Sequence, residues 1–190
     1  AHTKHQFPLG HKLYAPKGIG ALYVRRGVEF EPLIYGGGQE AGRRAGTENV
    51  AYMVALGAAC FLAQEQLEES MLWIQRLRDL LEQRLKEYLG RNAVFNGHPT
   101  ERLPNTLNMT FARVLGEEVL ANAPEIAAST GSACHAGKTE PSPVLMHMRF
   151  YPNRALGAVR MSLGRWSTEE EVERAAKLLV KSVESLWEKN

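Results

Sequence analysis

The most regular hydrophobic pattern in the chain lies between Ser70 and Leu89. Its apolar residues recur at spacings of three and four, with arginine, glutamate and lysine between them: Met71, Ile74, Leu77, Leu81, Leu85 and Tyr88. This spacing places them on one face of a helix, so the segment predicts an amphipathic helix with one buried side. Gly90 is typical of a helix C-terminus and predicts where this helix ends.

Two further helices are expected on either side of it. The segment from Thr47 to Gln66 is rich in alanine and leucine and carries few charges, which predicts a helix that is buried nearly all round. Near the C-terminus, Ser167 and Glu170 have the spacing of a capping box and predict the start of a last helix. Its core face consists of Val172, Ala176, Leu179, Val183 and Leu186.

Shorter segments have the patterns of strands. Polar and apolar residues alternate in Thr106–Phe111 and in Val159–Leu163, which predicts two half-buried strands. The apolar run Ile19–Val24 predicts a short buried strand. Ala93–Phe95 predicts another, because the turn pair Asn96-Gly97 follows it.

Strands and helices are thus interspersed, which predicts an α/β or α+β fold. Gly116–Ala123 is expected to add one more helix. A chain of 190 residues can bury one good core or two small ones. Because the pattern changes near Glu69, we expect a first lobe over residues 1–68 and a second over residues 69–190.

Composition excludes several classes of protein. A net charge of +2 gives no electrostatic reason to invoke nucleic acid or a membrane surface. No apolar run reaches the roughly 18 residues of a spanning helix, and the N-terminus does not resemble a signal peptide. Two cysteines, Cys60 and Cys134, make no disulfide framework, which favours a reducing compartment. We therefore expect a soluble, cytoplasmic protein.

The first segment with possible chemistry runs from Gly10 to Gly18 and contains His11 and Lys12. A lysine can form a Schiff base only when its amine is deprotonated, and burial or a nearby cation favours that state. His11 could donate a hydrogen bond to a phosphate. The alternative is a loop with a solvated lysine.

The second such segment is Arg43–Asn49. A glycine, the hydroxyl of Thr47 and a helix N-terminus together suit an anion, because backbone N–H groups and the positive end of the helix dipole face one point. The alternative is that Thr47 only caps its helix, with Arg43 and Arg44 in solvent.

The third segment contains Cys134, which lies among small, hydroxyl-bearing and glycine residues from Ala128 to Gly137. Such neighbours suit an exposed loop tip that carries a nucleophile, and His135 could favour its thiolate. Cys60, within the apolar helix, fits instead the usual buried and inert cysteine.

The fourth such segment is Val159–Arg165, and one weaker feature, a histidine pair, lies near the N-terminus. Arg160, alone among strand residues, is either an edge charge or a bidentate clamp for a carboxylate. Arg165 is expected at a strand end as a structural cation. His2 and His5 have a spacing found in metal sites, but no further ligand joins them, so no metal is expected.

Taken together and in this order, these segments resemble the pyridoxal-phosphate (PLP)-dependent cysteine desulfurases, a class V aminotransferase group that also contains selenocysteine lyase. The resemblance runs from residue 10 to the C-terminus. It rests on five stretches: GHKLYAPKGIGALYVRR, GGGQEAGRRAGTENV, RLPNTLNMTF, ASTGSACHAGKTEPSPVL and ALGAVRMSLGRWSTEEEV.

The resemblance implies a role for each candidate residue. Lys12 would bind PLP covalently and move protons at the substrate's α-carbon, and His11 would contact the cofactor phosphate. Thr47 would reach the phosphate of PLP in the partner subunit of a homodimer. Arg160 would bind the substrate carboxylate, and Cys134 would take the sulfur of L-cysteine as a persulfide.

The resemblance also implies a fold, and the sequence departs from the family's pattern in two places. The chain would be the C-terminal half of a PLP-dependent fold type I enzyme, with residues 1–68 ending the large domain and residues 69–190 forming the small C-terminal domain. The family's N-terminal half, which completes the cofactor pocket, is absent, so we expect weak PLP binding by this chain alone. Thr3–Leu9 also lacks the apolar strand usual there.

The expected function is a cysteine desulfurase, or a fragment of one. It would supply sulfur to an acceptor or scaffold protein for iron–sulfur cluster or thio-cofactor synthesis. Selenocysteine lyase is the alternative enzyme on the same scaffold. A non-catalytic interaction or dimerisation module is the alternative that the missing half favours.

Overall fold

The computed structural model describes residues 5–6, 9–131 and 140–189. It divides into two compact units, Ala1–Leu67 and Glu68–Asn190, each described here by itself. Their boundary lies beside Glu69, where the sequence pattern changes. The fold class is mixed α/β, as the sequence predicts. That the units correspond to the large and small domains of the PLP fold stays a prediction.

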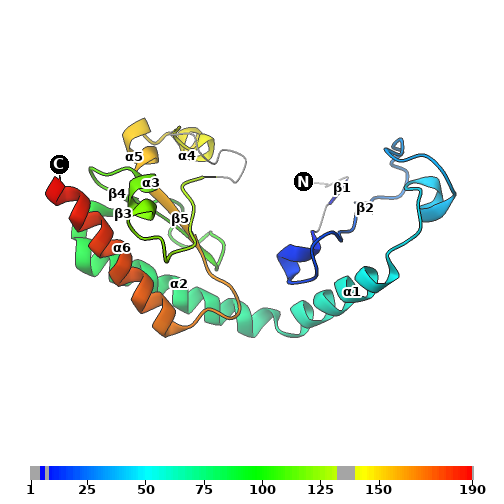
Figure 1. Cartoon of the computed structure of the whole chain (residues 1–190), viewed down its shortest axis with the longest axis horizontal. Coiled ribbons are helices and arrows are strands. Elements are labelled where there is room, and N and C mark those ends of the chain that lie inside the picture. The colour runs from blue at the N-terminus through cyan, green and yellow to red at the C-terminus, as the bar shows by residue number, and fades with distance from the viewer. Residues whose placement is uncertain (1–4, 7–8, 132–139, 190) are drawn as a thin grey trace. The chain divides into compact units, whose positions relative to one another are not determined.

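The second unit is built on a three-stranded antiparallel sheet (Figure 1). Its order is β3 (Ala93–Phe95), β4 (Thr106–Phe111) and β5 (Ala158–Ser162). The predicted strands over 93–95 and 106–111 are confirmed at both ends, and the third lies one residue earlier than predicted. Within the register, Asn108 of β4 pairs with Arg160 of β5.

Two long helices, α2 (Leu67–Leu89) and α6 (Glu169–Lys189), lie on one side of this sheet (Figure 1). Two short helices, α4 (Pro143–His147) and α5 (Pro152–Leu156), lie at the other side; the sequence patterns did not predict them. The predicted helix near Gly116 is α3 (Gly116–Ala121). The 3-10 turn Gly90–Asn92 ends α2, with Gly90 at a positive φ of 55°.

The core lies between the sheet and the two long helices. Alternate residues of β4 face it, and Leu107, Met109 and Phe111 are almost completely buried. The helices contribute Leu77, Leu81 and Leu85 from α2 and Val172, Ala176, Leu179, Val183 and Leu186 from α6. The predicted core face of α6 is therefore confirmed. On α2, Met71 and Tyr88 are exposed, and Leu89 instead of Tyr88 takes the buried position at the end of the helix.

The opposite face of the sheet carries a hydrogen-bond network around Asn96 beside a small apolar cluster of Leu145, Ala155 and Ala158. Asn96, buried after β3, donates from Nδ2 to Asn108 Oδ1 and to Thr110 Oγ1, both at 2.8 Å. Its Oδ1 accepts from Arg154 Nε of α5 at 2.9 Å, and Thr110 Oγ1 donates to the Arg154 carbonyl at 2.9 Å. The Asn96 side-chain amide and the Thr110 hydroxyl thus have partners, which offsets the cost of burying them.

The capping box of α6 lies one residue later than predicted. Thr168 N donates to Glu171 Oε2 at 2.9 Å, and Glu171 N donates to Thr168 Oγ1 at 3.2 Å. Ser167 instead accepts from the Gly164 amide at 3.1 Å, in the turn after β5. The prediction was wrong because Thr168 and Glu171 have the same spacing, and the helix begins at Glu169.

A charged cluster joins α2 to the loop before β4. Arg102 Nη2 donates to Glu82 Oε2 at 2.8 Å, and its guanidinium lies 4.2 Å from the ring centroid of Phe95. Arg78, buried, donates to Asp79 and to the Leu103 carbonyl. Burial raises the pKa of Glu82, but hydrogen bonds from Lys86 and Arg102 outweigh it, so the net pKa is lowered.

The described part of the first unit contains several short elements and one long α-helix. The pair β1 (His5–Gln6) and β2 (Tyr23–Val24) is antiparallel, and two 3-10 helices, η1 (Gly10–Leu13) and η2 (Gln39–Gly42), precede the helix α1 (Val50–Glu65). The predicted buried strand over Ile19–Val24 was wrong in length and burial. Only its last two residues form a strand, and Tyr23 is exposed.

Helix α1 differs from its prediction in two ways. It begins at Val50, capped by Asn49, whose Oδ1 accepts from Tyr52 N at 3.2 Å; Thr47 is therefore not its cap. Of the residues in α1, all of which are described, Ala59 alone is buried, whereas Val54 and Phe61 are 67% and 62% exposed. The all-round burial predicted from composition fails because few parts of this unit pack on the helix.

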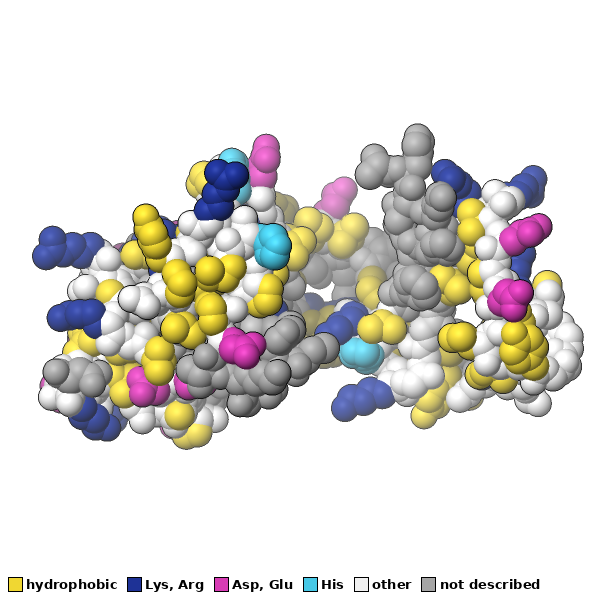
Figure 2. Space-filling view, turned by 90° about the horizontal axis from the view of Figure 1, so that it is seen from above, with side chains coloured by type: hydrophobic (Ala, Val, Ile, Leu, Met, Phe, Trp, Pro, Cys, Tyr) yellow, Lys and Arg dark blue, Asp and Glu magenta, His cyan; other side chains and the backbone are white. Residues whose placement is uncertain are grey.

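Hydrophobic side chains are visible on the surfaces of both units (Figure 2). Among the described residues no single helix is long and apolar enough to cross a membrane; α1 and the helix after it pass that test only as a bent pair.

Candidate functional site

Lys12 lies on a tight turn that three main-chain hydrogen bonds stabilise. The Gly10 amide donates to the Ile19 carbonyl at 2.9 Å, and the Lys12 amide donates to the Leu9 carbonyl at 3.0 Å. The Ala15 amide donates back to the Gly10 carbonyl at 3.0 Å. These bonds hold the backbone while the side chains of His11 and Lys12 remain exposed. The turn therefore presents an amine from a fixed backbone.

Gly10 is required by this geometry. A Cβ at position 10 would lie 2.7 Å from Ile19 Cγ2 and 2.8 Å from the Ile19 carbonyl oxygen, closer than real contacts allow. The glycine is buried, so the crowding atoms have little space to move into. The close approach of the two backbone segments explains why a glycine precedes His11 and Lys12.

We expect Gly10→Ala to loosen this turn and to lower whatever activity depends on Lys12. The added methyl must push Ile19 away and weaken the bond from the residue-10 amide to its carbonyl, at an expected cost of about 1–3 kcal/mol. Hydrogen exchange at amides 10, 12 and 15 would measure the loosening. Gly38→Ala serves as the control for glycine replacement, because a Cβ there meets nothing within 4 Å and the backbone has an ordinary negative φ of −83°. Unchanged exchange in Gly10→Ala would contradict the expectation.

Thr47 lies in a second loop of the same unit, two residues before the cap of α1. Gly46, at a φ of 99°, donates its amide to Gln39 Oε1 at 3.2 Å. Arg44 Nη1 donates to the carbonyl oxygens of Gly46 and Thr47 at 3.0 and 3.5 Å. Arg44 is therefore not simply solvated, because it supports the loop. The Thr47 side chain is exposed.

Arg160 belongs to the second unit, on the edge strand β5. Its side chain is exposed, and its backbone pairs with Ser129: the Arg160 amide donates to the Ser129 carbonyl at 2.6 Å, and the Ser129 amide donates to the Arg160 carbonyl at 3.1 Å. Among the described residues, none forms an ion pair with its guanidinium. An exposed guanidinium has the chemistry to bind a carboxylate through paired hydrogen bonds.

Cys134 and His135 lie outside the described residues, so the predicted thiol stays a prediction. Cys60 is described and exposed, which contradicts its expected burial. The reason is the exposure of α1, on which it lies. The convergence of the Lys12 amine, the Arg160 guanidinium and the Cys134 thiol on one substrate also stays a prediction, since Lys12 and Arg160 belong to different units.

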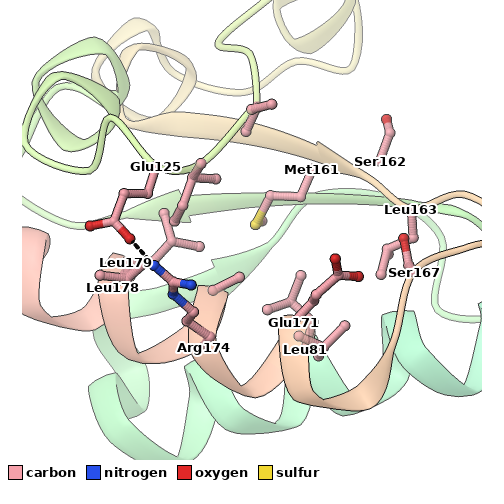
Figure 3. A pocket seen from close by; sticks show the side chains of 15 residues that line it. Leu81, Glu125, Met161, Ser162, Leu163, Ser167, Glu171, Arg174, Leu178 and Leu179 are labelled. Carbon is pink, nitrogen blue, oxygen red and sulfur yellow. Dashed lines mark hydrogen bonds and ion pairs between the residues drawn. The ribbon is translucent and has the colours of Figure 1, made fainter.

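A hollow in the second unit lies between α6, the end of β5 and the segment before Ser129 (Figure 3). An ion pair between Glu125 and Arg174 is drawn across it in Figure 3, and Met161 lines its wall. Arg160 precedes Met161 on β5, and neighbouring strand residues point to opposite faces. The hollow is therefore not the site that Arg160 would form.

Within the described residues, no three His, Cys, Asp or Glu side chains lie close enough together to hold a metal ion. His5 lies on β1, and His2 is outside the described residues. Arg165, expected as a structural cation, lies with its guanidinium 5.5 Å from the ring centroid of Trp166.

The described residues of the first unit fit the chemistry of PLP. The exposed Lys12 amine can react with an aldehyde, and the exposed His11 ring and Thr47 hydroxyl can donate hydrogen bonds to a phosphate. The backbone that carries Lys12 is held by the bonds around Gly10, so the amine starts from a defined position. These residues would hold only part of the cofactor.

Sequence reasoning missed Ser129 as a residue of this site. Its pairing with Arg160 depends on the fold, because 30 intervening residues separate the two positions. The only sequence signal is its place in the small-residue stretch that leads to Cys134.

Comparison with known proteins places these features in a family. A family model described as aminotransferase class-V matches residues 8–175. Cysteine desulfurase of Gluconacetobacter diazotrophicus is 52% identical over 87% of this chain and 42% of its own length. Cysteine desulfurase IscS of Methanosarcina thermophila is 45% identical over 93% of this chain and 44% of its own length.

Solved structures agree. A NifS-like protein superposes with a TM-score of 0.81 at 34% identity, covering 96% of this chain and 46% of that one. A NifS-like protein from Rickettsia africae gives a TM-score of 0.83 at 28% identity, covering 95% and 48%.

The chain therefore spans less than half the length of the relatives it matches. These matches do not confirm the expectation that the shared part is their C-terminal half. The matched range nevertheless contains every residue that carries the candidate site, from His11 to Arg160. On the strength of that range, the chain belongs to the aminotransferase class-V family.

Proposed function

We propose that this chain is the part of a PLP-dependent cysteine desulfurase that carries its reactive lysine and its sulfur-accepting cysteine. The observation that carries the proposal is that Lys12, Thr47, Cys134 and Arg160 all fall within the range that matches the family, in a chain 45–52% identical to proteins named cysteine desulfurases. Because those relatives are more than twice as long, the complete pocket needs residues beyond these.

The roles of the chain's own residues follow from their chemistry. Arg160 binds the substrate carboxylate through paired N–H···O bonds, for which a planar guanidinium is suited. His11 and Thr47 donate to the cofactor phosphate, Thr47 across a homodimer. PLP, when bound, withdraws electrons from the substrate's α-carbon. The Lys12 amine removes a proton at that carbon and later returns one.

The sulfur step belongs to Cys134. Its thiolate forms an S–S bond to the substrate sulfur as the bond from that sulfur to the β-carbon breaks, and the electron pair left at carbon takes up a proton. The products are alanine and a persulfide on Cys134. An acceptor or scaffold protein then receives the sulfur, for iron–sulfur cluster or thio-cofactor assembly. We place this chemistry in the cytoplasm, where a thiol stays reduced.

Mass analysis after incubation of the holoenzyme with L-cysteine tests the proposal. We expect one added sulfur atom on the peptide that contains Cys134, together with release of alanine. Cys134→Ser should abolish the added mass. Cys60→Ser should leave it unchanged and controls for modification of an exposed thiol.

Two other outcomes of this experiment would favour the alternative functions. Turnover restricted to selenocysteine would replace the desulfurase by a selenocysteine lyase. A protein that binds no PLP and releases no alanine would be a non-catalytic module.

A further inference from the structure

Asn108 and Arg160 lie side by side on the face of the sheet that is turned away from the two long helices. They are directly opposite each other in the register of β4 and β5. Their strand neighbours Met109 and Val159 are completely buried in the core, so the alternation of side chains directs Asn108 and Arg160 to the other face. Arg160 is exposed and Asn108 is half-buried, so solvent reaches both side chains.

The hydrogen-bond pattern brings these two side chains close together. The Arg160 amide and carbonyl both bond to Ser129, on the side of β5 away from β4. Arg160 and Asn108 are therefore a pair without main-chain hydrogen bonds between them. In such pairs the Cα atoms are about 4.5 Å apart and the side chains are at their closest. An amide and a guanidinium in this arrangement can bind the same small anion.

The orientation of the Asn108 amide is fixed from a distance by Arg154. A guanidinium donates hydrogen bonds and accepts none, so the 2.9 Å contact of Arg154 Nε identifies the Asn96 atom it meets as the oxygen Oδ1. The Asn96 Nδ2 group therefore points the other way. There it donates to Asn108 Oδ1 and to Thr110 Oγ1, both at 2.8 Å. Asn108 thus uses its side-chain oxygen inside the protein.

Other contacts hold Arg154 and Asn96 in this arrangement. Arg154 Nη2 donates to the Phe95 carbonyl at 3.1 Å, and its guanidinium lies 4.0 Å from the ring centroid of Phe150. Asn96 is 6% exposed, and its main-chain amide donates to the Asn108 carbonyl at 2.9 Å. Reversal of the Asn96 side-chain amide would set its NH2 group against the Arg154 guanidinium, a donor against a donor. The orientation of Asn96 is therefore stable.

The Nδ2 group of Asn108 remains as a donor beside Arg160. Among the described residues, Asn96 is the hydrogen-bond partner of the Asn108 side chain, and it contacts the oxygen. With the opposite orientation, that oxygen would accept from Arg160 and occupy the guanidinium. In the observed orientation the pair presents donors only, together with one positive charge. This combination suits a carboxylate, whose oxygens only accept.

We propose that Asn108 binds the substrate carboxylate together with Arg160, and that Asn96 and Arg154 are positioning residues that keep the Asn108 Nδ2 donor directed outward. This inference rests on the proposed function, in which Arg160 binds that carboxylate. It adds a second donor and the residues that orient it. A ligand that lacks a carboxylate gains nothing from either donor.

Steady-state kinetics of the holoenzyme with L-cysteine test the donor. In Asn108→Leu, KM should rise by about tenfold with kcat within about twofold, because a bond made equally in the ground state and the transition state is lost. Asn108→Asp still accepts from Asn96 but sets a negative charge beside Arg160, so KM should rise further. Asn153→Leu is the matched control, since Asn153 is exposed on α5 and its side chain makes no hydrogen bond to a described residue.

Asn96→Asp tests the positioning. The new carboxylate still accepts from Arg154 but cannot donate, so Asn108 should turn its Nδ2 inward and its oxygen toward Arg160. KM should then rise at least as much as in Asn108→Leu, although position 96 is buried. When Asn96→Asp is added to Asn108→Leu, KM should stay within about twofold of the Asn108→Leu value, because the first change acts through the second residue. Multiplication of the two single effects would overturn the positioning role.

Two inhibitors separate carboxylate recognition from a general distortion of the site. β-Mercaptopropionate has the thiol and the carboxylate of cysteine, so its inhibition constant should rise in Asn108→Leu by the same factor as KM. Cysteamine has the thiol and the amine but no carboxylate, and its inhibition constant should stay within about twofold. Equal weakening of both inhibitors would overturn the proposal.

Solvent exchange of side-chain amide protons, measured by NMR on the full chain, adds a readout that needs no turnover. Both Nδ2 protons of Asn96 are bonded and should exchange slowly, whereas those of Asn108 should exchange fast. In Asn96→Asp the Asn108 protons should become protected. Protected Asn108 protons in the wild type would overturn the proposal, and this result stands even if Asn96→Asp fails to fold.

These outcomes are distinguishable from a failure of the proposed function. A wild-type holoenzyme that releases no alanine overturns the proposed function, and the substrate role of Asn108 falls with it. The exchange pattern of the two amides is independent of turnover and still decides how Asn108 is oriented. An active wild type with an unchanged KM in Asn108→Leu overturns the carboxylate role alone.

Discussion

Lys12→Ala is expected to remove both the absorbance of bound PLP and the release of alanine from L-cysteine. The amine is the group in the first unit that can bond covalently to the cofactor and move a proton at the substrate's α-carbon. Without it, turnover should fall by at least about a thousandfold, the scale seen when a covalent catalytic group is removed. An absorbance spectrum and an alanine assay measure the two effects separately.

Two further variants show whether the amine acts by its chemistry or by its charge. Lys12→Arg keeps the positive charge, but a guanidinium stays protonated and cannot form the covalent bond, so it should fail like alanine. Lys17→Ala alters another exposed lysine of the same loop and should keep absorbance and turnover near wild type. Near-normal turnover in Lys12→Arg would contradict the covalent role.

Phe111→Ala should cause the largest loss of stability in the second unit. The Phe111 side chain is 1% exposed and is the largest fully buried side chain of the described core. Its removal loses buried apolar area and leaves a cavity between the sheet and the helices, with an expected cost of about 3–5 kcal/mol in the free energy of unfolding. Phe111→Leu keeps part of the volume and should cost less.

Tryptophan fluorescence during urea unfolding measures this effect in the whole chain. All three tryptophans, Trp73, Trp166 and Trp187, lie in the second unit, so the signal reports on that unit alone. Tyr151→Ala is the control, because this aromatic side chain is 83% exposed and its loss should change stability by less than about 0.5 kcal/mol. Equal midpoints for the two alanine variants would show that the described core does not hold the unit together.

The sequence predictions are accurate for segments that pack against other parts of the chain and poor for segments that pack against little. The strands over 93–95 and 106–111 and the core face of α6 were predicted well, since their alternating or helical patterns match a core that this unit supplies. For α1 the composition predicted burial, but the described residues cover little of it, and both Phe61 and Cys60 are exposed.

At the N-termini of two helices, more than one residue had the chemistry of a cap. The spacing of a capping box occurs at Ser167 and again at Thr168, and the start of the helix selects the second. Thr47 and Asn49 could each cap α1, and Asn49 does so. Which residue caps the helix depends on where the preceding turn places the backbone. The spacing of residue types carries no information about that placement.

The sequence by itself determined the family, the mixed α/β class and the residue types of the candidate site, because these follow from motifs and periodicities along the chain. The tertiary structure alone decided which residues become neighbours. It placed Gly10 against Ile19 and Ser129 beside Arg160, pairs brought together by turns and sheet register. The physical reason is that hydrogen-bond pairing between distant segments depends on how the whole unit packs, and no single segment encodes that.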